Sequence, residues 1–329
     1  MSKKSAPDNR PLWKILILRR LKMLAIIVAV LIIVGGGIYL LAPQWLIRAN
    51  NWRMASAAGL DTYHLQVGDT DWAYYEGGKG PTMVLLHGYG ANRNAWLKVA
   101  KGLTKNFRVI IPDLPGWGDS TRNKNDDYGI KAQSGRLYGF LHTLGINHEM
   151  LVGESMGGAI AGYYASEHPA NVGALVLIDS FGLKFKQNAF AKEALAGKNP
   201  FIFDNRAQFA RTAKLVFDKP PELPGRFVDV LVDRNKANRA FLTKVFDELR
   251  QPAAYTILDT RLSKLTMPVL GIWCRDDRII DPSALDTLRN GLTAATSISA
   301  TVINDCGHVP AIEKPEAVVR ILGGFAISH

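Results

Sequence analysis

Cysteine is scarce in this 329-residue chain, which contains only Cys274 and Cys306. Two cysteines exclude a disulfide-rich scaffold, and they are too few to form a zinc site by themselves. The sequence also lacks internal repeats and low-complexity segments. Because 47% of its residues are apolar, the chain can bury a substantial core, as one large domain or two small ones.

Acidic residues are rare at the N-terminus, where nine basic residues and one acid, Asp8, precede Met54. The whole chain carries a formal net charge of +11, from 40 basic and 29 acidic residues. Without the N-terminal segment, 31 basic and 28 acidic residues remain, a net charge of +3. The excess positive charge therefore belongs to the N-terminal arm, and nucleic-acid binding is excluded as the main function.

Charge is absent from the 20 residues between Met23 and Ala42. As a helix this stretch is about 30 Å long, enough to cross a bilayer. We therefore predict a basic arm over residues 1–22, a transmembrane helix over 23–42 and a short linker over 43–61 with a helical turn at 55–58. The bilayer is thus a predicted partner.

Basic residues lie mainly before this apolar stretch: seven precede it, whereas only Arg48 and Arg53 follow it closely. The positive-inside rule then places the N-terminus in the cytoplasm and the folded domain on the far side, the periplasm if the membrane is a bacterial inner membrane. A cleaved signal peptide is the alternative. It is disfavoured because its apolar core is usually shorter, and because Leu40 stands where a small residue should precede a cut after Ala42.

Strand-like and helix-like stretches alternate after the linker, which predicts a mainly parallel sheet covered by helices on both faces. The predicted strands cover residues 63–67, 72–76, 82–86, 108–111, 149–152, 174–178, 268–273 and 299–303. Between residues 182 and 261 this rhythm gives way to helical patches and prolines. We interpret 62–181 and 262–329 as one core and 182–261 as a helical cap inserted after the sixth strand.

Aromatic residues gather in and beside the predicted cap, which has ten of the thirteen phenylalanines, from Phe181 to Phe246. They have two interpretations. A small helical cap needs aromatic side chains for its own core. Alternatively, the cap roofs an acyl-chain pocket or rests on the bilayer.

The stretch Gly153-Glu154-Ser155-Met156-Gly157 matches G-x-S-x-G, in which a serine sits on a sharp turn between a buried strand and a helix. An apolar stretch precedes the motif, and small residues suited to a closely packed helix follow it. This context predicts that Ser155 is a catalytic nucleophile. A serine hydroxyl is a poor nucleophile near neutral pH, so it needs a base and a third group that orients the base.

His308 is the predicted base because it follows the last predicted strand, as expected for the chain order Ser, acid, His. The acid should follow the preceding strand, where Asp276 and Asp277 are adjacent. We favour Asp277, with Asp276 as a turn-capping neighbour. Asp179, at the end of the sixth predicted strand, remains an alternative acid.

Two backbone amides are predicted to form the oxyanion hole, that of Met156 after the nucleophile and that of Tyr89 in the loop after the third predicted strand. His87 is predicted to stiffen this loop. With Gly88 it belongs to the predicted substrate-binding wall, together with Trp117 in the turn of residues 113–120.

These motifs together resemble the α/β-hydrolase superfamily from about residue 62 to the C-terminus. They comprise His87-Gly88, Asp113-x-x-Gly-x-Gly-x-Ser120, Gly153-x-Ser155-x-Gly157, Asp277 and Gly307-His308. Within the superfamily the chain is most similar to the membrane-anchored monoacylglycerol lipases of the α/β-hydrolase domain group and to related bacterial lipases and esterases. The features that carry this similarity are the N-terminal span, Gly153–Gly158, the 231–238 stretch and Asn304–His308.

The resemblance implies an α/β-hydrolase fold, with a mostly parallel eight-stranded sheet, helices on both faces and a helical cap after strand 6. It also implies that the chain is a serine hydrolase, a monoacylglycerol lipase or carboxylesterase, that cleaves lipid esters through an acyl-serine intermediate without cofactor or metal. One departure is Cys274, where many relatives have glycine, and it bears on the alignment of Asp277. If the domain lies in an oxidising compartment, Cys274 and Cys306 either form a disulfide or remain independent buried thiols.

Serine at position 155 argues against the relatives that use aspartate there, the haloalkane dehalogenases and epoxide hydrolases. Cofactor-free perhydrolases and carbon-carbon bond hydrolases keep the serine and remain alternatives. A catalytically silent, membrane-tethered binding protein is an alternative of another class, because a fold alone does not establish activity. The sequence makes no prediction of acyl-chain length, head group or oligomeric state.

Overall fold

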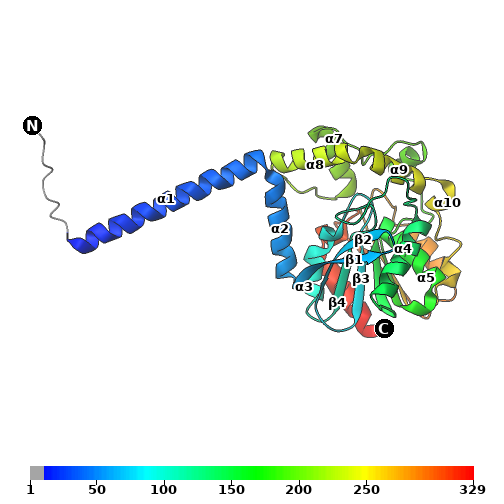
Figure 1. The fold of residues 1–329 in the computed structure, drawn as a ribbon. Helices are drawn as coiled ribbons and strands as arrows, with labels where there is room; N and C mark the ends of the chain where they lie inside the picture. The colour runs from blue at the N-terminus through cyan, green and yellow to red at the C-terminus, as the bar shows by residue number, and fades with distance from the viewer. Residues whose placement is uncertain (1–10) are drawn as a thin grey trace, which may run out of the picture.

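The computed structural model describes residues 11–329, so the first ten residues of the predicted basic arm lie outside it. Eight strands form one sheet (Figure 1). They are β1 (Leu60–Val67), β2 (Thr70–Gly77), β3 (Thr82–Leu86), β4 (Arg108–Pro112), β5 (Glu149–Glu154), β6 (Val172–Ile178), β7 (Val269–Cys274) and β8 (Ile298–Ile303). Strands β1 and β2 begin before the predicted bounds because the ladder between them runs from Leu60 opposite Gly77 to Val67 opposite Thr70.

The strand order is β1-β2-β4-β3-β5-β6-β7-β8. Strand β2 is antiparallel to both of its neighbours, and all other neighbouring pairs are parallel. The central strands are buried on both faces, as their continuous apolar sequences require. The predicted mostly parallel eight-stranded sheet is confirmed.

Helices cover both faces of the sheet (Figure 1). Packed beside the core strands are α3 (Leu97–Leu103) and α13 (Pro315–Ser328) on one face, and α4 (Ile130–Thr143), α5 (Met156–Glu167) and α11 (Ala284–Gly291) on the other. The short helices are α12 (Pro310–Glu313) and the 3-10 turns η1 (Arg93–Trp96), η2 (Pro169–Asn171) and η3 (Leu262–Lys264). Each face has its own cluster of buried apolar side chains, so the sheet separates two cores.

The cap lies between β6 and β7 along the chain. It contains α6 (Ala189–Leu195), α7 (Arg206–Val216), α8 (Gly225–Ala237), α9 (Arg239–Leu249) and α10 (Pro252–Tyr255). Apolar side chains of α9, Leu242, Val245, Phe246 and Leu249, are buried in the same cluster as those of α4 and α5. The cap therefore packs on the hydrolase core through α9.

Helix α1 (Leu12–Leu41) is longer than the transmembrane helix predicted over 23–42. It begins eleven residues earlier, directly after Pro11, because the leucines, lysines and arginines of its first turns are good helix formers although some are charged. Its apolar side chains are largely exposed, Ile33 by 72%, and the helix projects away from the rest of the molecule (Figure 1). Within residues 11–329, α1 is the one helix long and apolar enough to cross a membrane.

The segment predicted as a short linker is mostly helical, so that prediction is corrected. Helix α2 (Pro43–Ala57) occupies it, and the turn predicted at residues 55–58 is only the end of this helix. Proline at the first helical position favours helix initiation, and Gly59, with φ of 65°, ends the segment before β1. A second helix, which packs on α3 and α8, therefore connects α1 to β1.

Candidate active site

Ser155 lies between the end of β5 and the start of α5, with φ of 54° and ψ of −120°. A positive φ is strained for a residue with a side chain, and such strain is characteristic of functional sites. The flanking glycines permit the turn. A Cβ atom on Gly153 would lie 2.2 Å from the Gly157 carbonyl oxygen, and one on Gly157 would lie 2.5 Å from the Leu86 carbonyl oxygen.

Three predicted side chains meet at this turn. His308 Nε2 lies 2.8 Å from Ser155 Oγ, and His308 Nδ1 lies 2.8 Å from Asp277 Oδ2. The imidazole and the carboxylate are both buried, each residue being 6% exposed. The structure thus brings together a hydroxyl, an imidazole and a carboxylate from residues up to 153 positions apart.

Asp277, not its neighbour Asp276, faces the imidazole. Its second oxygen, Oδ1, accepts hydrogen bonds from the amides of Ile279 at 2.7 Å and Ile280 at 3.1 Å. These bonds orient the carboxylate so that its other oxygen points at His308. Asp179 lies behind this pair, and its Oδ1 accepts a hydrogen bond from the Cys274 amide at 2.8 Å.

Two further buried carboxyl groups belong to this cluster: Glu154 acts on the imidazole, and Asp179 acts on Asp277. The sequence kept Asp179 as an alternative acid and gave no role to Glu154. Burial raises the pKa of Glu154 to about 7. Burial and the charge of Asp277 raise the pKa of Asp179 well above its usual value. Burial alone would lower the pKa of His308, but the charge and hydrogen bond of Asp277, with the charge of Glu154, outweigh it and raise that pKa. In the sequence, the signal for these two carboxyl groups was an acidic residue at the end of each of two apolar stretches.

The amides of Tyr89 and Met156 are free in the sense needed for an oxyanion hole. Among residues 11–329, neither amide donates a hydrogen bond to a backbone carbonyl in a turn, loop or cap. Met156 is the first residue of α5, a position at which the amide has no partner within the helix. Gly88 brings the loop close to the nucleophile, because a Cβ atom there would lie 3.0 Å from Ser155 Cβ.

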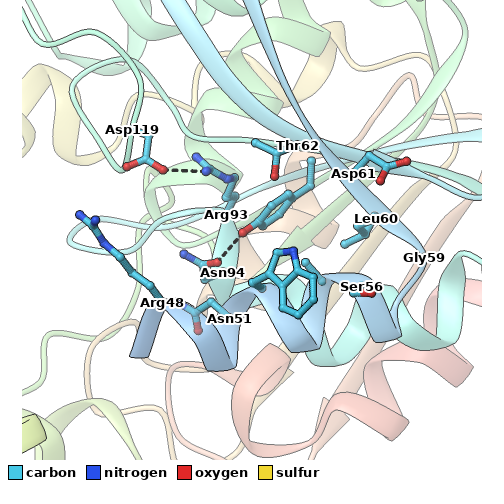
Figure 2. A pocket seen from close by; sticks show the side chains of 13 residues that line it. Arg48, Asn51, Ser56, Gly59, Leu60, Asp61, Thr62, Arg93, Asn94 and Asp119 are labelled. Carbon is cyan, nitrogen blue, oxygen red and sulfur yellow. Dashed lines mark hydrogen bonds and ion pairs between the residues drawn. The ribbon is translucent and has the colours of Figure 1, made fainter. Parts of the chain in front are cut away.

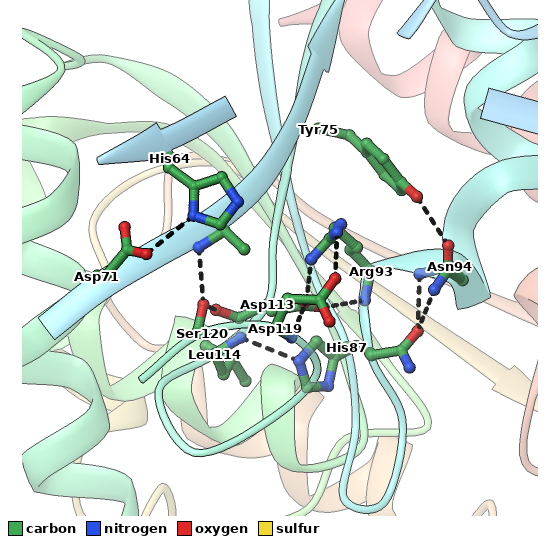
Figure 3. Close-up of polar contacts among 12 residues, drawn as sticks. His64, Asp71, Tyr75, His87, Arg93, Asn94, Asp113, Leu114, Asp119 and Ser120 are labelled. Carbon is green, nitrogen blue, oxygen red and sulfur yellow. Dashed lines mark hydrogen bonds and ion pairs between the residues drawn. The ribbon is translucent and has the colours of Figure 1, made fainter. Parts of the chain in front are cut away.

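His87 supports this loop with both ring nitrogens, and Figure 3 shows its contact with Leu114. Nε2 accepts a hydrogen bond from the Leu114 amide at 3.0 Å, and Nδ1–H donates to the Gly88 carbonyl at 2.9 Å. Burial lowers the pKa of His87, in keeping with a neutral ring. Since both nitrogens have backbone partners, any contact of His87 with substrate is through the face or edge of the ring.

A buried ion pair holds the neighbouring turn in place (Figure 3). Asp113 pairs with the Arg93 guanidinium, and its oxygens also accept hydrogen bonds from the amides of Arg93 at 2.7 Å and Asp119 at 2.8 Å. Gly118 is required beside this carboxylate, because a Cβ atom there would lie 2.0 Å from Asp113 Oδ2. The turn carries Trp117, whose ring is 3% exposed and packs against Tyr89 and the cap residue Phe241.

A separate cavity of about 680 Å³ lies between α2 and the edge of the sheet at β1 and β2 (Figure 2). Arg48, Arg93, Asp61 and Asp119 are among its lining residues, so basic and acidic side chains balance there. None of the lining residues belongs to the cluster around Ser155. Among residues 11–329 no group of three or more His, Cys, Asp or Glu side chains is arranged to hold a metal ion.

Cys274 and Cys306 form a disulfide, with their Cα atoms 5.0 Å apart. The two alternatives left open by the sequence are thus resolved in favour of the bond. Cys274 ends β7 three residues before Asp277, and Cys306 lies two residues before His308. The bond therefore ties together the two loops that carry the acid and the imidazole.

We expect replacement of both cysteines by alanine to lower the free energy of unfolding by about 3–4 kcal/mol, because a crosslink between residues 32 positions apart restricts the unfolded chain. Urea denaturation in detergent measures the change. As a control, a reducing agent should destabilise the native sequence and leave the double variant unchanged. Two reactive thiols in the unfolded, unreduced protein would contradict the assignment.

Comparison with known proteins places this geometry in a family. The alpha/beta hydrolase fold family matches residues 81–315, which include every residue of the Ser155 cluster. Monoacylglycerol lipase ABHD6 of Rattus norvegicus is 29% identical over 303 residues, covering 88% of this chain and 89% of the relative. Lipase 1 of Psychrobacter immobilis is 30% identical over 247 residues, covering 73% of this chain and 75% of the relative.

Among solved structures, that of a membrane phospholipase A described as a bacterial virulence factor is similar over most of its length. It superposes with a TM-score of 0.83 and 32% sequence identity, covering 93% of this chain and 98% of the other. This match covers more of the chain than the family match over residues 81–315. The chain belongs to the α/β-hydrolase fold family.

Proposed function

We propose that this enzyme hydrolyses acyl esters of lipids through an acyl-serine intermediate on Ser155. His308 is the general base, and Asp277 fixes its tautomer. The observation that carries the proposal is the continuous chain of two 2.8 Å contacts from Asp277 through His308 to Ser155 Oγ, at a strained turn. Each role follows from chemistry: the hydroxyl needs a proton acceptor, and the acceptor needs an orienting carboxylate.

The reaction has two steps. His308 Nε2 takes the proton of Ser155 as Oγ attacks the ester carbonyl, and then returns it to the departing alcohol. Water next attacks the acyl-serine with the same base, which releases the fatty acid and restores the hydroxyl. The amides of Tyr89 and Met156 stabilise the oxyanion in both steps. Gly88 keeps the loop close to the nucleophile, and His87 and Trp117 form the wall behind the acyl site.

The proposed substrate is a monoacylglycerol with a medium or long acyl chain. Curated relatives that match most of this chain bear the name monoacylglycerol lipase, and others are called lipases. The phenylalanine-rich cap suits an acyl chain, since Phe201, Phe241 and Phe246 cluster around Tyr89 and Trp117. A phospholipid is the second candidate, because a membrane phospholipase A is similar over 93% of this chain.

We further propose that α1 crosses the membrane with its N-terminus in the cytoplasm, so that the catalytic domain lies on the far side, the periplasm in the case of a bacterial inner membrane. Basic residues concentrate before and within the first third of α1 and are sparse after it. The disulfide between Cys274 and Cys306 is in keeping with an oxidising compartment. A protease-protection assay on sealed vesicles tests this topology.

An acyl-length series tests the substrate assignment. With monomeric glycerol monoesters from acetate to octanoate in water, we expect kcat/KM to rise by up to about fourfold for each methylene that moves from water into the pocket, because burying one CH₂ is worth about 0.8 kcal/mol. Glycerol monooleate is assayed in mixed micelles. Phospholipids in the same micelles form the comparison arm. Fastest turnover of the acetate ester would refute the lipid assignment, and faster turnover of phospholipid would favour the second candidate.

A further inference from the structure

The side chain of Tyr89 enters the cap, although its backbone lies in the loop after β3. Its hydroxyl donates a hydrogen bond to the Leu242 carbonyl in α9 at 2.7 Å and accepts one from Asn199 Nδ2 at 3.3 Å. These partners lie in separate cap segments, 153 and 110 residues further along the chain. One side chain of the loop therefore connects it to two parts of the cap.

Aromatic packing surrounds this connection. The Tyr89 ring lies 5.4 Å from that of Phe201, 6.2 Å from that of Phe246 and 5.3 Å from that of Trp117, measured between ring centroids. Burial raises the pKa of the Tyr89 hydroxyl, so it remains protonated and able to donate. In this apolar environment a hydrogen bond has little competition from water.

We propose that Tyr89 is a positioning residue that fastens the cap to the oxyanion hole. The inference rests on the proposed function, in which the amide of this same residue stabilises the oxyanion. An oxyanion hole works only if its donors are already in place when charge develops. While the hydroxyl is bound to α9, the seated cap holds the amide in place, and displacement of the cap withdraws that support.

The cap contains a matched control. The hydroxyl of Tyr255 in α10 is also buried, but among residues 11–329 it has no hydrogen-bond partner. Tyr89→Phe and Tyr255→Phe each remove one buried hydroxyl and keep the ring and the backbone. Only Tyr89→Phe also removes a hydrogen bond between the loop and the cap.

Three measurements compare the two variants with the native enzyme in detergent. The first is kcat and KM on a soluble nitrophenyl butyrate. The second is inhibition by a trifluoromethyl ketone, whose tetrahedral adduct with serine requires the oxyanion hole. The third is hydrogen exchange of the α9 amides. Ser155→Ala is included as the test of the mechanism itself.

For Tyr89→Phe we expect about fivefold lower kcat with KM unchanged, about fivefold weaker inhibition and about fivefold faster exchange in α9, as the loss of one hydrogen bond implies. Tyr255→Phe should match the native enzyme in all three. A variant that was merely less stable would not selectively weaken binding of the tetrahedral analogue.

The outcomes separate this inference from the proposed function. If Tyr89→Phe behaves like Tyr255→Phe while Ser155→Ala is inactive, the esterase mechanism stands and the positioning role is overturned. Faster α9 exchange with unchanged kcat and inhibition also overturns it, because the hydroxyl would then hold only the cap. If Ser155→Ala remains active, the mechanism fails, and with it the role of the Tyr89 amide.

Discussion

Replacing Ser155 with alanine is expected to lower kcat on a nitrophenyl ester by a factor of the order of 10⁶, as removal of the nucleophile does in other serine hydrolases. The large effect follows from the chemistry: without Oγ no acyl intermediate forms, and His308 has no hydroxyl to deprotonate. Labelling by a serine-directed fluorophosphonate should disappear in parallel. Product release under initial-rate conditions and in-gel fluorescence of the probe provide the two measurements.

The matched control is Ser166→Ala in the same helix, α5. Ser166 is also buried, but its hydroxyl donates to the Tyr163 carbonyl at 2.7 Å and takes no part in the cluster around His308. It should retain native turnover and labelling. Equal turnover by Ser155→Ala and the native enzyme, with both folded by circular dichroism, would remove the basis of the acyl-serine mechanism.

The fold could be predicted from the sequence because local and long-range signals agree. Strand β5, the turn at Ser155 and helix α5 are each encoded by adjacent residues, and the glycines at 153 and 157 meet a steric need within that same segment. The strand order then brings the loops after β7 and β8 to the same sheet edge as the turn. Placing His308 and Asp277 after those strands was therefore enough to predict that they approach Ser155.

Contacts made by side chains across the chain could not be predicted in this way. Nothing local to Tyr89 indicates that its hydroxyl reaches Leu242, because the cap has no strand register that fixes which residue faces the loop. Asp179 was kept as an alternative acid because it follows the sixth strand, but its place beside Asp277, with a backbone φ of 43°, could not be predicted. Helix α2 was missed for another reason: its sequence is only weakly amphipathic, and its stability comes from packing on α3 and α8.

Asp277→Asn is expected to lower kcat by about 10⁴. The amides of Ile279 and Ile280 continue to bind the side-chain oxygen, so the new NH₂ group is turned toward His308 Nδ1. The imidazole then carries its proton on Nε2 and cannot accept one from Ser155. Steady-state kinetics with nitrophenyl butyrate measures the loss, and the trifluoromethyl ketone tests whether the oxyanion hole remains intact.

Asp179→Asn provides the matched comparison, because both residues are buried aspartates, and Asp277 contacts the imidazole whereas Asp179 accepts a hydrogen bond from the Cys274 amide. Burial and the neighbouring Asp277 raise the pKa of Asp179 well above its usual value, which favours a neutral carboxyl group that an amide can replace. An asparagine side chain can accept a hydrogen bond from the Cys274 amide, as Asp179 does, and asparagine tolerates a positive φ. We therefore expect turnover within about threefold of native. If Asp179→Asn lost activity while Asp277→Asn kept it, Asp179 would be the catalytic acid.

The pH profile distinguishes a neutral Asp179 from a charged one. His308 must be unprotonated to act as a base, so kcat/KM falls as the pH drops through its pKa, which Asp277 and Glu154 hold above the usual value against the effect of burial. If Asp179 is neutral, Asp179→Asn leaves the midpoint of this acidic limb unchanged. If it is charged, removing that charge lowers the pKa of His308 and shifts the limb to lower pH. Glu154 is present in both enzymes, so its own titration does not alter the comparison.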